Sequence, residues 1–137
     1  MAVVTELIRS EENGTISFGD YTLGAKSKLD NFEHAGDIYK VKTFGEITKL
    51  EKNGMFAYES VPGTAVMNMK ATEDGVEFEV EGLEDAEITL GLAEETDYNV
   101  TVDGNNVGQM KTNLGGKLTL SVEMNSDAVV PVKVERV

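Results

Sequence analysis

The chain has 137 residues and no cysteine, and its 25 acidic and 12 basic residues give a formal net charge of -13 at pH 7. This length fits a single domain, and the lack of cysteine excludes disulfides, thiolate metal sites and cysteine nucleophiles. The negative charge disfavours nucleic acid and anionic lipid surfaces as partners, and neither a membrane-spanning run nor an export signal is visible. We therefore expect a cytoplasmic protein with no nucleic-acid partner and no membrane insertion.

The first half of the chain predicts short strands, and one segment there fits a helix or a strand almost equally well. Residues 3–8 carry four apolar side chains that fit one helix face, yet several are β-branched and fit a strand almost as well. Residues 27–34 predict a single helical turn, because two apolar side chains lie three positions apart. The strand-like segments are residues 15–18, 21–23, 38–43 and 65–69.

One segment near the middle has two interpretations. Residues 47–51 and 55–58 flank Lys52-Asn53-Gly54, as two strands flank a hairpin turn. Thr43 and Glu46 also form a capping-box pattern ahead of an apolar pair, which is typical of a helix start. We favour the hairpin.

The second half carries the clearest signal for strands. Residues 76–81 alternate apolar side chains with glutamates, which places three carboxylates on one face. The same period of two recurs in residues 88–92, 98–102, 118–122 and 130–134. Turn-forming residues at 73–75, 103–106 and 113–116 favour antiparallel hairpins between these strands. Pro131 lacks a ladder donor, so we expect the last strand at an edge, or pairing on only one side there.

About ten short strands without a sustained helical period predict an all-β fold, an antiparallel β-sandwich of the jelly-roll or immunoglobulin-like kind. We expect one domain over residues 1–137, with a weak boundary at 61–64, because each half alone would be about 60 to 75 residues without a staple. Both ends are apolar and strand-like. A terminal strand can pair within its own domain or with another copy of the chain.

Acidic residues are concentrated in one segment. Residues 71–110 hold twelve acids and no base, whereas residues 1–70 hold ten acids and eight bases. Because apolar residues alternate with these acids, we expect the segment to fold with its carboxylates outward. Calcium prefers several oxygen ligands, although neither acidic cluster matches a spaced calcium loop. The two candidate clusters are Glu84, Asp85 and Glu87, and Glu94, Glu95 and Asp97.

Two resemblances to known proteins can be read from the motifs. The run 98–104, with Gly108 and residues 112–118, resembles immunoglobulin-like accessory modules at the ends of bacterial glycan-active enzymes. Over nearly the whole chain, the sequence resembles a group of small acidic bacterial proteins that carry the label endosialidase, in residues 14–24, 59–64 and 113–117. This resemblance implies cleavage of sialic-acid polymers, or a glycan-binding accessory domain.

The residues that such an enzyme needs are scarce. Sialidase-type sites hold the substrate carboxylate with several arginines, and this chain has only Arg9 and Arg136. His34 is the single histidine and has no nucleophile motif beside it, so we expect it in a surface loop. No sequence sign of a base accompanies any tyrosine. The four tyrosines are Tyr21, Tyr39, Tyr58 and Tyr98.

Aromatic residues offer one further candidate surface. Tyr39, Phe56 and Tyr58 form either a small platform for a glycan or, as we favour, core and cross-strand packing. The sequence thus assigns no catalytic, cofactor-binding or metal-binding residue. It favours a non-catalytic, self-assembling or structural subunit that acts through strand edges and terminal strands as a homo-oligomer. A glycan-binding or endosialidase-like accessory domain is the alternative, and a calcium-dependent adhesive module is the third hypothesis.

Overall fold

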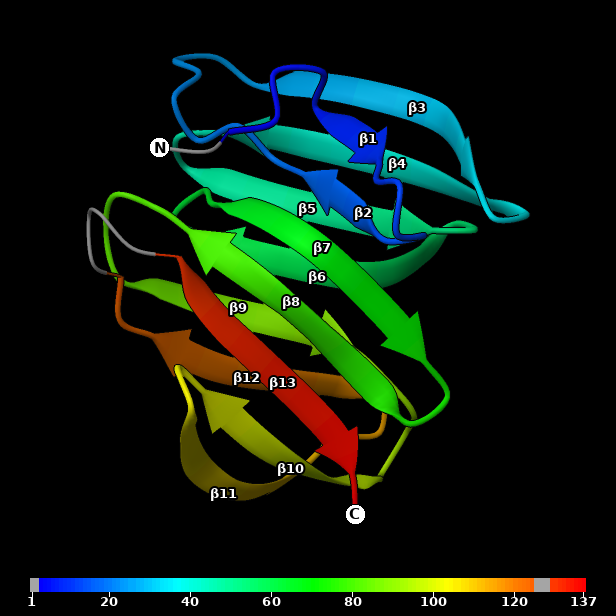
Figure 1. Ribbon diagram of the computed structural model, residues 1–137, viewed down its shortest axis with the longest axis vertical. Helices are drawn as coiled ribbons and strands as arrows, with labels where there is room; N and C mark the ends of the chain where they lie inside the picture. Colours follow the sequence, from blue (N-terminus) through cyan, green and yellow to red (C-terminus); the bar gives the residue numbers. More distant parts are fainter. Residues whose placement is uncertain (1–2, 125–128) are drawn as a thin grey trace.

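The structure is a computed structural model that describes residues 3–124 and 129–137 and arranges thirteen strands of these residues in two antiparallel sheets (Figure 1). The described residues contain no helix, and so none that could cross a membrane. The all-β class predicted from the sequence is confirmed. The sequence alone suggested about ten of these strands.

Each sheet has its own strand order. Sheet A contains, in spatial order, β1 (Ile8–Ser10), β2 (Ile16–Phe18), β7 (Ala65–Thr72), β8 (Gly75–Glu81), β13 (Val130–Arg136), β10 (Asp97–Val102) and β11 (Asn105–Lys111). Sheet B contains β12 (Lys117–Val122), β9 (Ala86–Gly91), β6 (Met55–Val61), β5 (Ile47–Lys52), β4 (Asp37–Phe44) and β3 (Ser27–His34).

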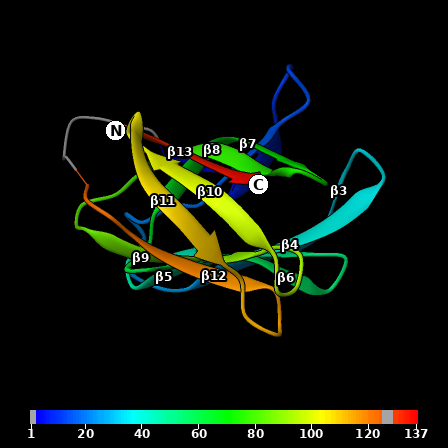
Figure 2. The ribbon, with the colours of Figure 1, turned by 90° about the horizontal axis from the view of Figure 1, so that it is seen from below.

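The two sheets pack face to face as two layers, with the hydrophobic core between them (Figure 2). Tyr58 of β6 is fully buried there, and its ring meets Phe18 of β2 and Phe78 of β8 edge-on, with centroids 5.2 and 5.7 Å apart. Edge-on contacts of this kind add to the stabilisation from burial. In β8, β9, β10, β12 and β13 the inward residues recur at every second position, which is why alternation in the sequence predicts these strands.

Sheet B is built on a meander in which β3, β4, β5 and β6 follow one another both in sequence and in space. The β5–β6 turn contains Asn53 (φ 53°) and Gly54 (φ 78°), the positive angles that a two-residue type I′ turn requires. The hairpin is therefore confirmed, and the helix start that Thr43 and Glu46 left open is not formed.

Residues 27–34 form the edge strand β3, so the predicted helical turn is wrong. The pairing register shifts between Leu29 and Phe32, and Asn31 has a φ of 58°. A bulge of this kind inserts an extra residue, so two side chains three positions apart both pack against the core. The spacing of these two side chains in the sequence therefore imitates that of a helix.

The segments on either side of β1 and β2 also differ from expectation. Residues 3–8, left open between helix and strand, form neither until β1 begins at Ile8. The strand expected at 21–23 is a turn, because the Asp20 carboxylate accepts hydrogen bonds from the backbone N–H (3.0 Å) and the hydroxyl (2.5 Å) of Thr22. Such local bonds compete with strand pairing.

All five strands predicted by alternation in the second half are present, and the predicted turns at 73–75 and 103–106 close the antiparallel hairpins β7–β8 and β10–β11. The turn at 113–116 does not form a hairpin, because it leads from β11 in one sheet to β12 in the other. β9 and β12 lie in sheet B, whereas β8, β10 and β13 lie in sheet A, so the chain crosses between layers repeatedly. β11 was not predicted, because its residues are mostly polar and exposed and show no alternation. Glu81 also departs from the predicted outward pattern, since only 4% of its surface is exposed.

The last strand, β13, lies between β8 and β10. The expected edge position is therefore wrong. Pairing on only one side at Pro131 is also not fully met. Pro131 is paired with Glu79 of β8 and the residue pairs with β10 end at Val132, but the Pro131 carbonyl still accepts a hydrogen bond from the Asp103 N–H, just beyond β10, at 2.8 Å. The C-terminal strand is thus held on both sides within its own domain.

A group of buried hydroxyls lies where the chain passes from β6 to β7. The Thr64 hydroxyl is 2.7 Å from the Tyr58 hydroxyl and 2.8 Å from the Ser60 hydroxyl. The Thr48 hydroxyl donates to the Thr64 carbonyl (2.8 Å) and lies 2.8 Å from the Thr43 hydroxyl. All five side chains are buried, so their hydroxyls depend on one another and on nearby backbone groups for hydrogen bonds.

Candidate functional site

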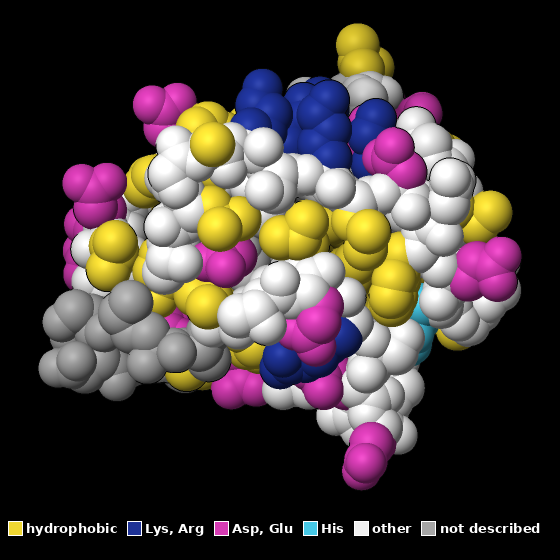
Figure 3. Space-filling view, turned by 90° about the horizontal axis from the view of Figure 1, so that it is seen from above, with side chains coloured by type: hydrophobic (Ala, Val, Ile, Leu, Met, Phe, Trp, Pro, Cys, Tyr) yellow, Lys and Arg dark blue, Asp and Glu magenta, His cyan; other side chains and the backbone are white. Residues whose placement is uncertain are grey.

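Five lysines gather on the outer side of β3, β4 and β5, and we call this surface the lysine face. Its members are Lys26, Lys28, Lys40, Lys42 and Lys49. Lys28 is the cross-strand partner of Lys42, and Lys42 is the partner of Lys49. Because partners share one side of a sheet and strands lie about 4.8 Å apart, three like charges form a line across the sheet. Figure 3 shows dark blue side chains gathered at the upper margin, on the side of sheet B.

Carboxylates lie beside these lysines, and exposed Asp30 stands two positions after Lys28 in β3. Lys40 is partnered by Glu51 and Lys49 by Glu59. Among the residues that the structure describes, however, no carboxylate oxygen comes within 4.0 Å of the ammonium nitrogen of any lysine of the face. The positive charge is therefore not neutralised by direct ion pairs.

The lysines also act on one another. The charge of Lys26, then slight desolvation, then the charges of Lys28, Lys49 and Lys40 lower the pKa of Lys42 from its ordinary value. Like charges directly opposite each other destabilise a sheet. The arrangement is thus unfavourable for the folded chain when nothing anionic is bound to it.

Phe56 of β6 borders the lysine face. Its ring lies 4.5 Å from the Lys117 ammonium and 5.9 Å from that of Lys49, measured to the ring centroid, which is the range of cation–π contacts. Gly91 of β9 leaves room for it, because an added Cβ there would lie 2.2 Å from the Phe56 carbonyl oxygen and 3.2 Å from the ring. The glycine thus allows β6 and its phenylalanine to lie close to β9 on this face.

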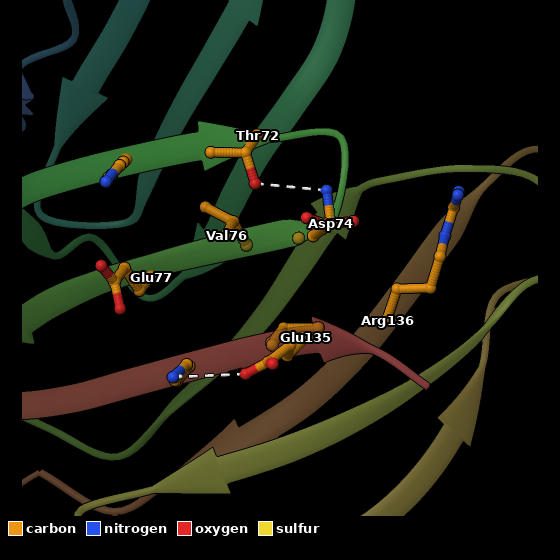
Figure 4. Close-up of a pocket in the computed structure, with 10 residues that line it drawn as sticks. Thr72, Asp74, Val76, Glu77, Glu135 and Arg136 are labelled. Atoms are coloured by element: carbon orange, nitrogen blue, oxygen red, sulfur yellow. Dashed lines mark hydrogen bonds and ion pairs between the residues drawn. The ribbon is translucent and has the colours of Figure 1, made fainter.

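A cleft of about 610 Å³ reaches Phe56 at the border of the lysine face, but none of the five lysines lines it. Two adjoining clefts, of about 450 and 550 Å³, run over the outer side of β7, β8 and β13 and share Lys70, Glu77 and Lys133. Figure 4 shows the first of them, with Lys133 paired to Glu135 at 3.2 Å and Arg136 pointing away from the other labelled side chains. Charges of both signs line this surface, so it has no clear preference for a cation or an anion.

A small cleft of about 150 Å³ contains His34 and Tyr39, whose ring centroids lie 6.3 Å apart. The Nε2 of His34 donates to the Gly14 carbonyl at 3.0 Å, because that carbonyl can only accept, and Nδ1 lies 2.7 Å from the Ser10 hydroxyl. Both ring nitrogens are therefore engaged. His34 lies in β3 instead of the expected loop, and it connects β3 to β1 and the β1–β2 turn.

The other residues considered for catalysis are dispersed or buried. Tyr39 and Tyr58 pack in the core while Phe56 lies on the outer side, so the three aromatic residues form no platform. Burial raises the pKa of Tyr39 and of Tyr58, which disfavours the tyrosinate needed for a nucleophile. Arg9 in β1 and Arg136 in β13 are separated by three strands, or roughly 19 Å across sheet A. The remaining tyrosines, Tyr21 and Tyr98, are also buried.

Neither calcium candidate cluster is assembled into a site. In the described ranges, no three His, Asp or Glu side chains are placed to hold a metal ion. Asp85, a member of the first cluster, accepts a hydrogen bond from the backbone N–H of Met124 at 2.9 Å.

The sheet edges differ in their capacity to pair with another strand. The described edge strands are β1 and β11 of sheet A and β3 and β12 of sheet B. β1 has three residues, and register shifts interrupt the pairing of β3 and β11. Bulges and short length are known protections of sheet edges. β12 pairs with β9 over six residues without interruption, so it is the most regular of these edges.

Comparisons with family models, curated proteins and solved structures gave no match to this chain. The functional inference therefore rests on the geometry of the chain alone.

Proposed function

We propose that this chain is a non-catalytic binding subunit whose lysine face docks a partner rich in carboxylates. The observation that carries the proposal is the row of Lys28, Lys42 and Lys49, in register on three strands and without a carboxylate within 4.0 Å among the described residues. A row of like charges costs stability. Departures of this kind from the rules of stability are expected at functional sites.

The chemistry of the face indicates the kind of partner. The face has five lysines and no arginine, and the ammonium group is a point charge without the planar fork that binds phosphate in two places. Nucleic acid carries about one charge per 1.7 Å of duplex, which the net charge of -13 repels strongly. Separate ammonium charges without guanidinium forks match a partner that presents single carboxylates.

The shape of the site supports a broad contact. The lysine face is an open sheet surface, and the clefts of the described residues are lined by other side chains. β13 is paired on both sides, and three of the four described edges are short or interrupted. The lysine face is therefore preferred to these three edges as the contact surface, and β12 is the one regular edge that remains.

Binding of poly-L-glutamate, measured by isothermal titration calorimetry at about 20 mM NaCl, tests the proposal. The variant Lys28→Gln/Lys42→Gln/Lys49→Gln is expected to bind about tenfold more weakly, since the charges that attract the polymer are removed. A matched control changes three exposed lysines of sheet A to glutamine and leaves affinity within about twofold. Those lysines are Lys70, Lys111 and Lys133.

An acidic polysaccharide, polygalacturonate, forms the second arm of the experiment. If it binds through the same lysines and poly-L-glutamate does not, the chain is a glycan-binding module, the alternative derived from the sequence. Equal loss of binding in the two triple variants would contradict a specific role for the lysine face.

A further inference from the structure

We infer that the partner of the lysine face is a second copy of the same chain, an inference that rests on the proposed function. The reason is charge complementarity within one sequence. Five of the chain's twelve basic residues lie on the lysine face, while residues 71–110 hold twelve acids and no base. A solution of this protein therefore always contains a carboxylate-rich surface that the lysine face can contact.

Several of these acids meet at one end of the sandwich, which we call the acidic end. Its members are Glu73 and Asp74 of the β7–β8 turn, and Glu94, Glu95 and Asp97 of the segment that leads into β10. All five are exposed, and none has a lysine or arginine nitrogen within 4.0 Å in the described part of the chain. Both surfaces thus lack an ion-pair partner among residues 3–124 and 129–137 of the same chain.

Backbone hydrogen bonds fix the acidic end in place. The Arg136 N–H donates to the Asp74 carbonyl (2.6 Å), the Val137 N–H to the Asp97 carbonyl (3.1 Å), and the Glu95 N–H to the Asn113 carbonyl (3.2 Å). Two cations border the acidic end, Arg136 itself and Lys111 opposite Asp97, so the acids remain in excess. Carboxylates on a fixed backbone lose less conformational freedom when they bind.

The two surfaces lie at different parts of one molecule. In Figure 1, β3, β4 and β5 lie at the top, while the β7–β8 turn and the start of β10 lie toward the lower right. A contact between the lysine face of one copy and the acidic end of the next joins two unlike surfaces. Such a heterologous contact leaves one free surface of each kind, so it produces a ring or an open chain instead of a closed twofold dimer.

The contact is expected to depend strongly on salt, because both surfaces are exposed. Charges are screened over about 8 Å at 0.15 M salt and over about 3 Å at 1 M. We therefore expect the full chain to self-associate at about 20 mM NaCl and to become monomeric near 500 mM NaCl, as measured by sedimentation velocity.

Two complementary variants provide the decisive test. The face variant is Lys28→Gln/Lys42→Gln/Lys49→Gln, and the end variant is Glu73→Gln/Asp74→Asn/Glu94→Gln/Glu95→Gln. Each variant alone is expected to be monomeric at low salt, because each lacks one of the two surfaces. Mixed in equal amounts they should form a one-to-one dimer that does not grow, because the intact surfaces of the two variants can meet only once. Far-UV circular dichroism checks that both are folded.

A control variant tests whether self-association depends on where the carboxylates are removed or only on the change in net charge. The variant Glu12→Gln/Glu46→Gln/Glu84→Gln/Glu87→Gln changes the net charge by the same amount as the end variant, away from the acidic end. It should self-associate like the unchanged chain.

The outcomes distinguish this inference from the proposed function. A chain that stays monomeric at low salt but binds poly-L-glutamate through its lysines refutes the inference and leaves the proposed function standing. The inference also fails if the end variant self-associates normally, if the mixture yields no dimer, or if association persists at high salt, as pairing of strand edges would. A face variant that still binds poly-L-glutamate refutes the proposed function itself.

Discussion

The buried hydroxyl group around Thr64 allows a quantitative test of what holds the two layers together. Replacing Thr64 with valine keeps the shape of the side chain but removes the oxygen that lies 2.7 Å from the Tyr58 hydroxyl and 2.8 Å from the Ser60 hydroxyl. Neither hydroxyl has another hydrogen bond in the described structure, and both residues are fully buried. Thr64→Val therefore leaves two buried hydroxyls without partners.

The expected magnitude follows from these two groups. A buried polar group without a partner costs about 1–3 kcal/mol, so the two groups left by Thr64→Val should lower the free energy of unfolding by about 2–6 kcal/mol. Tyr58→Phe removes one hydroxyl and leaves the Thr64–Ser60 bond in place, so it should cost only about 1 kcal/mol. The double variant should be more stable than Thr64→Val alone, because the phenylalanine removes one of the two unpartnered hydroxyls.

Urea unfolding followed by far-UV circular dichroism measures these differences. A chain without tryptophan gives little fluorescence signal, whereas thirteen strands in the described residues give a clear β-sheet spectrum. The reasoning is refuted if Thr64→Val lies within about 0.5 kcal/mol of the unchanged chain, or if the double variant is less stable than Thr64→Val.

Three further predictions concern the charged and close-packed positions. Lys42→Gln should raise the melting temperature at low salt, because it relieves repulsion by its lysine neighbours; a gain that persists at about 1 M NaCl contradicts this. The Ser17 hydroxyl, and then the Arg9 side chain, lower the pKa of Glu11. The ionised Glu11 side chain therefore stabilises the fold at pH values above the ordinary carboxyl pKa, and this stabilisation is lost as the pH falls through the lowered pKa. Glu11→Gln should therefore flatten the decline of the melting temperature between about pH 5 and pH 3, and an unchanged acid profile would argue against it. Gly91→Ala places a Cβ against the Phe56 backbone and should cost about 1–3 kcal/mol in urea unfolding, so a neutral substitution would show that β6 and β9 can move apart freely.

The sequence predicts the strands well wherever burial alternates. In β8, β10 and β13 every second side chain faces the core. The alternation of apolar and polar residues in the sequence therefore predicts which side of each of these strands is buried. In β11 nearly all residues are exposed, and no alternation is left to detect. In β3 the bulge at Asn31 changes the spacing of the inward side chains and produces a false helical signal.

The lysine face was not predicted, for a topological reason. Lys40 and Lys42 stand two positions apart, which places them on one side of a strand. Lys28 and Lys49 join them only because the meander sets β3, β4 and β5 side by side in one register. The sequence showed that eight of the twelve basic residues lie in residues 1–70, but it did not show which strands are neighbours. Similarly, His34 showed no partner in the sequence because Ser10 and Gly14 are brought to it only by the closing of the two sheets.

The position of β13 between β8 and β10 has a consequence for the folding of the chain. Sheet A cannot be completed until the last of the thirteen described strands in chain order inserts between β8 and β10. Before β13 inserts, β8 and β10 each have one side with unpaired backbone groups. The pairing of β13 with β8 then joins segments that are far apart in the sequence. Folding that depends on such distant contacts is slow, so we expect refolding of this chain in milliseconds to seconds, with the nascent chain at greatest risk of aggregation while residues 130–136 are still being synthesised.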